Sequence, residues 1–296
     1  MNRLALKRFF WWMHERHRIY LRKSREFPWP WTNDEILQTY KFTNVFRELD
    51  AGTIWCRRYI REPYACHPEL FFNIATYRRY NRIETAEDIG FIDDYRYRSG
   101  DIIAKMMARR DDNLPIFTSA HMVCGTIRDA DGNIPDNKVT QIFDISFRDL
   151  WNRRKEVEPQ PGDTLQEAYN RLLDAKIPGY GEFICYEVIT DLRHTRYLRD
   201  AEDIFTWANP GPGAKHGIIR LYGNSPTDPD RARFSYDEYV DVMYWLQEKF
   251  NRFRQDWMPE VEMRDIEHSL CEFDKYERVR LGEGRPRMKY KPSQQV

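Results

Sequence analysis

Hydrophobic residues recur every three or four positions in several long stretches of the chain, which is the spacing of a buried helix face. The clearest case lies in residues 236–253, where the repeating positions are Tyr239, Met243, Leu246, Phe250 and Phe253. The same reasoning predicts further helices at residues 4–24, 68–80, 101–110 and about 138–155. The pattern therefore indicates a mainly helical protein.

Capping boxes predict where three helices begin. In this motif a Ser or Thr side chain accepts a hydrogen bond from the backbone N–H three residues later. The Glu at that later position accepts a hydrogen bond from the backbone N–H of the Ser or Thr. The pairs with this spacing are Thr32–Glu35, Thr164–Glu167 and Ser235–Glu238. Apolar residues keep helical spacing through residues 42–49, so we expect helix there as well.

Residues 114–140 differ from the rest of the chain. An Asp-Gly pair at 131–132, flanked by β-branched residues, indicates an exposed loop or a small hairpin. After Gly282 the chain is basic and contains proline. Because no linker interrupts the remainder, we predict one helical domain over residues 1–281 and a basic flexible tail over residues 282–296.

Residues 172–192 have the pattern of a helix-hairpin-helix element, with the turn at residues 177–181. Glycines permit a tight turn, and the second helix begins with unpaired N–H groups that attract anions such as DNA phosphates. Gly179, Tyr180 and Gly181 are therefore candidate DNA-binding residues. The alternative is an ordinary turn between two core helices.

Composition excludes few classes of protein. The chain has 47 basic and 47 acidic residues, which does not exclude DNA binding, because the distribution of charge matters more than its sum. The five cysteines form no CxxC pair, which argues against a disulfide framework and a zinc ribbon. We find no signal peptide and no membrane span, and we expect a cytoplasmic protein without membrane partners.

A glycine-rich segment, residues 209–217, places backbone N–H groups beside cations. Such groups can cradle a phosphate or a pyrophosphate. The candidate phosphate-binding residues are Gly211, Gly213, Lys215 and His216. The spacing is not that of a P-loop. The alternative is an irregular loop that leads into a helix.

Residues 265–278 would carry several reactive groups on one helix. Glu267, Cys271, Lys275 and Arg278 would share one face, with Glu272 on the neighbouring face beside Tyr276. Such a set can move protons and stabilise a leaving group. The alternative is a surface helix with ordinary salt bridges, and a lone Cys271 is more often a packing residue than a nucleophile.

Residues 44–50 place Asn44, Arg47 and Asp50 opposite an apolar stripe, where they either line a polar pocket or face water. His14 and His17 lie three residues apart without acidic or thiol partners in step, so we expect no metal site from them.

Five segments resemble, in order, the helical family of α-glutamyl/putrescinyl thymine pyrophosphorylases, a domain also named after the 5-hydroxymethyluracil DNA kinases beside which it is found. The segments are WWMHERHRIYLRK, PWTNDEILQTYKFTNVFRELD, IPGYGEF, NPGPGAKHGI and IEHSLCEFDKYER. The resemblance spans about Phe10 to Arg278. It implies an all-α fold related to helix-hairpin-helix DNA glycosylases, and a role in thymine hypermodification in bacteriophage DNA.

The resemblance also implies a reaction and its partners. Family members replace the phosphate or pyrophosphate of phosphorylated 5-hydroxymethyluracil in double-stranded DNA with an amino acid or a polyamine such as putrescine. A 5-hydroxymethyluracil DNA kinase would supply the substrate, and this chain is not expected to be that kinase because it has no P-loop.

Residue roles follow from this chemistry as expectations. Cations would neutralise the leaving group, a carboxylate would accept the proton of the amine, and an aromatic side chain would occupy the gap left by a flipped base. The cations are Arg47, Lys215 and Lys275, and the carboxylates are Asp203 and Glu267, with Glu272 and Asp191 also in the catalytic set. Asn44, Arg47 and Arg278 are further candidates for binding the substrate or its phosphate. The aromatics are Tyr180 and Trp207. Asp191, Asp200 and Asp203 all lie beyond the hairpin, where related glycosylases carry a catalytic aspartate, and they cannot be aligned uniquely.

The chemistry needs no cofactor. A divalent metal ion beside the pyrophosphate is compatible with it, but the sequence shows no ligand set. Three alternatives remain: a base-excising glycosylase, a non-catalytic DNA-binding module that partners the kinase, and a helical interaction protein without a DNA role.

Overall fold

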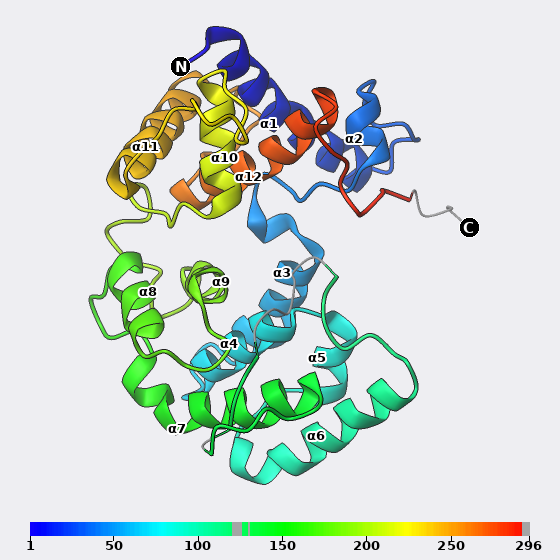
Figure 1. Ribbon diagram of the computed structural model, residues 1–296, viewed down its shortest axis with the longest axis vertical. Helices are drawn as coiled ribbons and strands as arrows, with labels where there is room; N and C mark the ends of the chain where they lie inside the picture. The colour runs from blue at the N-terminus through cyan, green and yellow to red at the C-terminus, as the bar shows by residue number, and fades with distance from the viewer. Residues whose placement is uncertain (120–125, 130, 292–296) are drawn as a thin grey trace. The chain divides into compact units, whose positions relative to one another are not determined.

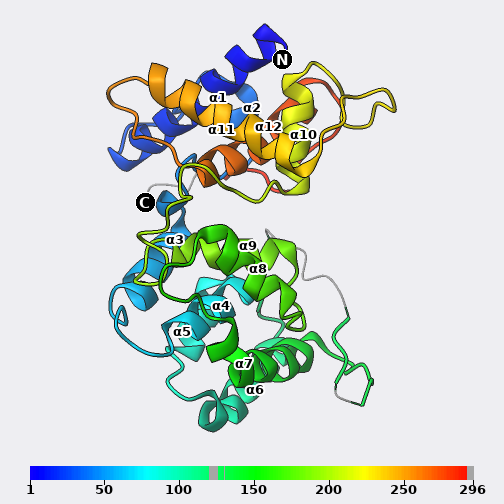
Figure 2. The same ribbon diagram turned by 90° about the vertical axis from the view of Figure 1, so that its left-hand side faces the viewer.

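The computed structural model describes residues 1–119, 126–129 and 131–291, and in these ranges the chain forms helices and no strand (Figures 1 and 2). The all-α prediction is confirmed. Contacts divide the chain into two compact units. Unit 1 contains Met1–Asp50 and Ile204–Val296, and unit 2 contains Ala51–Asp203. The grouping describes packing rather than independent folding, so the single domain stays a prediction.

Unit 1 is built from five helices and one 3-10 turn in its described part. The helices are α1 (Arg3–Ser24), α2 (Glu35–Thr39), α10 (Pro212–Leu221), α11 (Tyr236–Phe253) and α12 (Met263–Arg280), and the turn is Arg47–Leu49. The sequence sets several of these bounds. Asn2 caps α1 by accepting from the backbone of Leu4 and Ala5, and the predicted box at Ser235 caps α11.

The core of unit 1 lies between α1, α10, α11 and α12. Phe9 of α1 packs edge-on against Phe273 of α12, with 5.2 Å between ring centroids, and Phe10 packs similarly against Phe250 of α11. Helix α10 lies directly against α12 because glycines face it (Figure 1). A Cβ added at Gly217 would come within 2.3 Å of the Leu270 carbonyl oxygen.

Unit 2 comprises seven α-helices and two π-helical turns in its described part. The helices are α3 (Ala51–Cys56), α4 (Leu70–Tyr80), α5 (Ile83–Ile89), α6 (Tyr95–Asp111), α7 (Phe147–Val157), α8 (Leu165–Asp174) and α9 (Glu182–Leu192), and the turns are Arg57–Arg61 and Thr140–Ser146. Every residue of α4 is buried, which makes it the central helix of the unit. Its Arg78 pairs with the buried Asp191 of α9 at 2.5 Å.

The predicted helices at 4–24, 68–80, 101–110, 138–155 and 236–253 are confirmed within a few residues, as are the boxes at Thr164 and Ser235. The box at Thr32 is wrong. Asp34 caps α2 instead, by accepting from the Leu37 backbone, and Thr32 accepts from Asp34. The helix expected over 42–49 is also wrong beyond its 3-10 turn, because Phe42 and Val45 are buried within unit 1 on non-helical backbone.

Two other segments concern the predicted insertion and the predicted tail. In the insertion, Asp129 accepts from the backbone of Asp131 and Asn133, which agrees with the exposed loop that was one of the two expectations. Residues 120–125 and 130 lie outside the described residues. In the predicted tail, residues 288–290 pair with 39–41 through an antiparallel bridge between Tyr40 and Lys289. Residues 292–296 lie outside the described residues.

Candidate functional site

Polar side chains from two distant segments of the sequence meet in unit 1. His268, Glu272 and Lys275 lie on one face of α12, at helical steps of four and three. Residues 43–50 pass along this face. We call these three residues, together with Arg16, Thr43, Asn44, Arg47 and Asp50, the α12 cluster.

Thr43 links the two segments of the α12 cluster. Its backbone N–H donates to Glu272 Oε2 at 3.0 Å, and its hydroxyl lies 2.5 Å from His268 Nε2. Arg47 Nη1 lies 3.2 Å from His268 Nδ1. Because a guanidinium only donates, His268 accepts at Nδ1 and donates from Nε2 to the Thr43 hydroxyl. Lys275 lies 2.6 Å from Glu272.

Asn44 and Asp50 complete the cluster on the side of the 3-10 turn. The Asn44 backbone and side chain both donate to Asp50 Oδ1, at 2.9 and 3.0 Å. Arg16 of α1 donates to the Phe42 carbonyl at 3.1 Å. The Asn44 Oδ1 and Arg16 Nη1 atoms are buried and have no hydrogen-bond partner among the described residues. Such groups are costly to bury, so they are candidates for contact with a ligand.

Burial dominates the protonation of this region. It lowers the pKa of His268 well below its ordinary value, with Arg47 and Lys275 acting in the same direction, so the imidazole is neutral at pH 7. Burial raises the pKa of Asp50, although Arg47 opposes the shift. Asp265, one turn before His268 on α12, is buried, and its pKa is raised to about 7.

The arrangement combines permanent cations with a carboxylate and a neutral imidazole. Arg47 and Lys275 can attract a phosphate, and Glu272 can accept a proton. Asn44, Arg47, Glu272 and Lys275 were all predicted as candidates, and the structure brings these four together.

The glycine-rich segment meets α12 on a different face. The Gly211 N–H points to Glu267 Oε1 at 3.3 Å, and a Cβ at Gly213 would lie 2.3 Å from Cys271 Sγ. This side of α12 therefore serves close helix packing. Burial raises the pKa of Cys271 to about 12, so the thiolate that a nucleophile requires is disfavoured.

The other predicted phosphate ligands separate from one another. His216 and Arg278 lie beside Asp274, at 3.9 and 3.2 Å. Lys215 lies over the Tyr239 ring of α11, 5.5 Å from its centroid. These cations surround the contact between α10 and α12 rather than the α12 cluster.

The predicted hairpin corresponds to α8, the turn after it and α9, all in unit 2. Gly179 has a left-handed φ of 84°, and a Cβ there would come within 2.9 Å of Arg79. Tyr180 is buried. Gly181 caps α9 without a side-chain hydrogen bond and is exposed, together with Glu182 and Phe183. The start of α9 is thus exposed, and its first turn carries the acidic Glu182.

The predicted catalytic aspartates have structural partners in unit 2. Asp203 accepts from the backbone of Leu165 and Gln166 at 2.7 and 3.0 Å, where it caps α8. Asp191 is buried against Arg78. Asp200 is exposed beside Arg199. In unit 1, Trp207 is buried and its N–H lies 3.2 Å from the Tyr236 hydroxyl, so neither Trp207 nor Tyr180 presents an open stacking face.

Sequence reasoning missed Arg16, Thr43, His268 and Asp265. The one available signal was the spacing of 268, 272 and 275, which places His268 on the face of two predicted residues.

The described residues lack a metal-binding group and a membrane-spanning helix. No three His, Cys, Asp or Glu side chains group as metal ligands. In the same ranges, no helix is both long and apolar enough to cross a bilayer.

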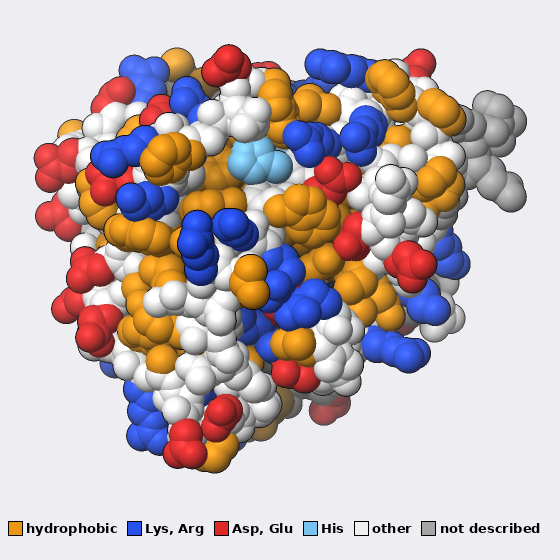
Figure 3. All heavy atoms as spheres, turned by 90° about the horizontal axis from the view of Figure 1, so that it is seen from above, with side chains coloured by type: hydrophobic (Ala, Val, Ile, Leu, Met, Phe, Trp, Pro, Cys, Tyr) orange, Lys and Arg blue, Asp and Glu red, His pale blue; other side chains and the backbone are white. Residues whose placement is uncertain are grey.

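On the face shown in Figure 3, Lys and Arg side chains lie between hydrophobic ones rather than in one continuous patch. This mixture suits a partner that offers both phosphates and base or ring surfaces.

Comparison with known proteins gives two matches. Residues 3–285 match the family described as "5-hmdU DNA kinase, helical domain". The 5-hmdU DNA kinase of Bacillus phage SP10 is 29% identical over 267 residues, which cover 83% of this chain and 40% of that protein. The chain thus spans less than half the length of this relative. No solved structure matches.

Proposed function

The chain belongs to the family of 5-hmdU DNA kinase helical domains, and from this premise we propose that it modifies phosphorylated 5-hydroxymethyluracil in phage DNA. In the proposed reaction an amino acid or a polyamine replaces the phosphate or pyrophosphate on the exocyclic methylene of the base. The observation that carries the proposal is the meeting of Arg47, His268, Glu272 and Lys275 in the α12 cluster.

The reaction is a substitution at carbon. A C–N bond forms between the amine and the methylene, and the C–O bond to the leaving group breaks, with its electron pair departing on phosphate or pyrophosphate. The amine loses one proton. The departing group becomes a better leaving group as its charge is neutralised, and the proton requires a base within hydrogen-bond reach.

The α12 cluster can supply both functions. Arg47 keeps its charge at any physiological pH and can hold two phosphate oxygens, and Lys275 adds a second cation. Glu272, which accepts from Thr43 and pairs with Lys275, can accept the proton once the phosphate draws Lys275 away. Neutral His268 fixes the orientation of Arg47 through its Nδ1.

Double-stranded DNA is the proposed polymer, and the open start of α9 after Gly181 is the proposed phosphate contact in unit 2. The target base would be flipped out of the stack, at a cost of about a few kcal/mol.

The test is mass spectrometry of nucleosides after the protein is incubated with DNA that contains pyrophosphorylated 5-hydroxymethyluracil and with a panel of amines and amino acids. We expect one substituted nucleoside together with released pyrophosphate. A folded protein that yields none on mono- or pyrophosphorylated DNA would overturn the transfer reaction. Abasic sites would instead indicate a glycosylase.

Two lysines allow the leaving-group role to be located. Lys275→Met should reduce turnover by about 100-fold or more while DNA affinity is kept, because one removed oxyanion donor costs that much in comparable sites. Lys215→Met tests the earlier candidate over Tyr239. Lys249→Met on α11 is the control, since Lys249 lies over Trp245 and outside both groups. If turnover is lost in Lys215→Met but not in Lys275→Met, the leaving group is bound at the glycine-rich segment and not at the α12 cluster.

One observation favours a second function. The relative named 5-hmdU DNA kinase extends well beyond the region that matches this chain. A module that binds DNA and partners a kinase would also fit, and it would bind the substrate DNA with no substituted nucleoside under any amine.

A further inference from the structure

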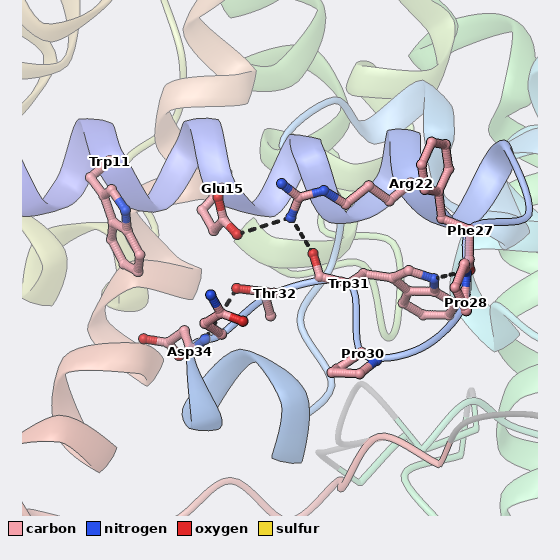
Figure 4. Close-up of a pocket in the computed structure, with 10 residues that line it drawn as sticks. Trp11, Glu15, Arg22, Phe27, Pro28, Pro30, Trp31, Thr32 and Asp34 are labelled. Carbon is pink, nitrogen blue, oxygen red and sulfur yellow. Dashed lines mark hydrogen bonds and ion pairs between the residues drawn. The ribbon is translucent and has the colours of Figure 1, made fainter.

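A hollow beside α1 is not part of the α12 cluster. It has a volume of about 530 Å³, within the usual range for ligand pockets. We call it the Trp–Pro pocket; its lining includes Trp11, Glu15, Arg22, Pro30 and Trp31. Figure 4 shows Trp11, Glu15 and Arg22 projecting from α1 toward the loop that carries Trp31, Thr32 and Asp34.

The walls of the Trp–Pro pocket are held by hydrogen bonds. Arg22 donates to the Trp31 carbonyl and lies 3.4 Å from Glu15. The Trp31 ring N–H donates to the Phe27 carbonyl at 2.7 Å. A pocket whose walls are fixed before binding loses less entropy when a ligand enters.

The chemistry of the pocket favours a flat ring over an ammonium group. Both carboxylates are already engaged, Glu15 with Arg18 and Arg22, and Asp34 with the Leu37 backbone and the Tyr276 hydroxyl. Trp11 is 40% exposed and offers a ring face. Asn33 lines the pocket and is exposed, so its amide can both donate to and accept from a base edge.

A second hollow of about 340 Å³ adjoins the first and shares Arg22 and Phe27 with it. We call it the arginine shelf; its lining is Arg18, Leu21, Arg22, Arg25, Phe27 and Trp257. Arg18 lies over the Trp257 ring, 5.1 Å from its centroid. Among the described residues no carboxylate pairs with Arg25. Arginines interleaved with aromatic rings are the usual groove for single-stranded nucleic acid.

We propose that this surface of unit 1 holds an unpaired stretch of DNA, with one base in the Trp–Pro pocket and the neighbouring phosphates on the arginine shelf. The two hollows share Arg22 and Phe27 in their linings, so they are near enough for a base to occupy one while its neighbouring phosphates lie at the other. The site requires neither the transfer reaction nor the α12 cluster.

The experiment measures binding of the full chain to oligothymidylate by fluorescence anisotropy, without any phosphorylated base. An oligonucleotide of equal length in which every residue is abasic is compared with it, because a single abasic residue would let another thymine enter the pocket. We expect Trp11→Ala to weaken binding of oligothymidylate by about tenfold, the scale of one lost base stack. Arg25→Ala should make the slope of the logarithm of the binding constant against the logarithm of salt concentration shallower by about 0.7, as for one lost single-strand phosphate contact.

The control is the Trp245 and Lys249 pair on α11, which also stacks a cation on an indole in unit 1. Trp245→Ala and Lys249→Ala should bind as the unchanged protein does. Equal affinity of the Trp11→Ala variant and the unchanged protein would overturn the base pocket, as would equal binding of abasic and complete strands. Competition by putrescine at low concentration would assign the pocket to an amine instead. Turnover on modified DNA is a separate readout, so it can fail while this binding holds.

Discussion

At the scale of single residues, the α12 cluster depends on which side chains of α12 face residues 43–50. Asn44, Arg47, Glu272 and Lys275 were predicted from local patterns, and the fold brings them together. Helical spacing orders side chains around an axis but does not say which face meets a distant segment. For this reason the helical spacing groups Glu267 and Cys271 with Lys275, although they face the α10 segment, and it gives no indication that His268 meets residues 43–50.

Asp265 provides a prediction at this scale, because burial raises its pKa to about 7. In the unfolded chain the pKa of an aspartate is about 3.9. Between that pH and the folded-state pKa, the folded protein therefore binds more protons than the unfolded chain. The free energy of unfolding therefore falls as pH rises through this window. The stabilisation from the protonated Asp265 carboxyl is fully present only below the unfolded-state pKa. Asp265→Asn removes this decline, by up to about 4 kcal/mol between pH 4 and 8. Urea unfolding of both proteins at several pH values measures it.

The control for Asp265 is Asp241→Asn, which changes an exposed carboxylate on α11. Its unfolding free energy should follow that of the unchanged protein across the range. If the Asp265→Asn curve also runs parallel to that of the unchanged protein, the buried carboxyl does not retain its proton.

At the scale of elements, most helices were predictable because their apolar period and their caps are local. The exceptions have a common cause. Residues 42–49 have helical spacing, yet residues 42–46 lie on non-helical backbone beside α12 and only 47–49 form a 3-10 turn. The glycine-rich segment is predicted to bind phosphate, and in the structure Gly213 and Gly217 also permit close packing of α10 on α12. Both interpretations of such glycines use the same residues, so the sequence alone does not choose.

The packing role of Gly213 can be tested with its partner. Gly213→Ala should destabilise the protein by about 1–3 kcal/mol or more, the usual cost of overpacking, because the new Cβ meets Cys271 Sγ. Cys271→Ala in the same chain should recover part of this loss, which a double-mutant cycle measures by thermal or urea unfolding.

Two further alanine variants serve as controls for the Gly213 and Cys271 cycle. Gly217→Ala should gain nothing from Cys271→Ala, since its Cβ would meet the Leu270 backbone. Gly100→Ala, where a Cβ meets nothing within 4 Å, should be neutral or stabilising. If the Gly213→Ala protein is as stable as the unchanged one, Gly213 is not required for packing, and the segment is better explained as a flexible loop that binds an anion.

At the scale of the whole molecule, the all-α class followed from the period of the sequence, but the division into two units did not. The chain leaves unit 1 at Asp50 and returns at Ile204 without a Gly- or Ser-rich linker at either point. Such a boundary has no compositional signal. The predicted hairpin and the α12 cluster belong to different units, so binding and chemistry can be altered separately.

Gly181→Val tests that separation. Gly181 has a φ of −88°, which any residue adopts, and a Cβ there meets nothing within 4 Å, so the variant should fold. The branched side chain would cover the start of α9 and keep a phosphate from its N–H groups. We expect weaker binding of duplex DNA and a salt slope reduced by about 0.9, as for one lost phosphate contact. Gly181→Ala should give a smaller effect in the same direction. Turnover at saturating DNA should stay unchanged, whereas Lys275→Met should show the reverse pattern. If a folded Gly181→Val protein binds duplex DNA with unchanged affinity and salt slope, the hairpin in unit 2 is an ordinary turn between core helices.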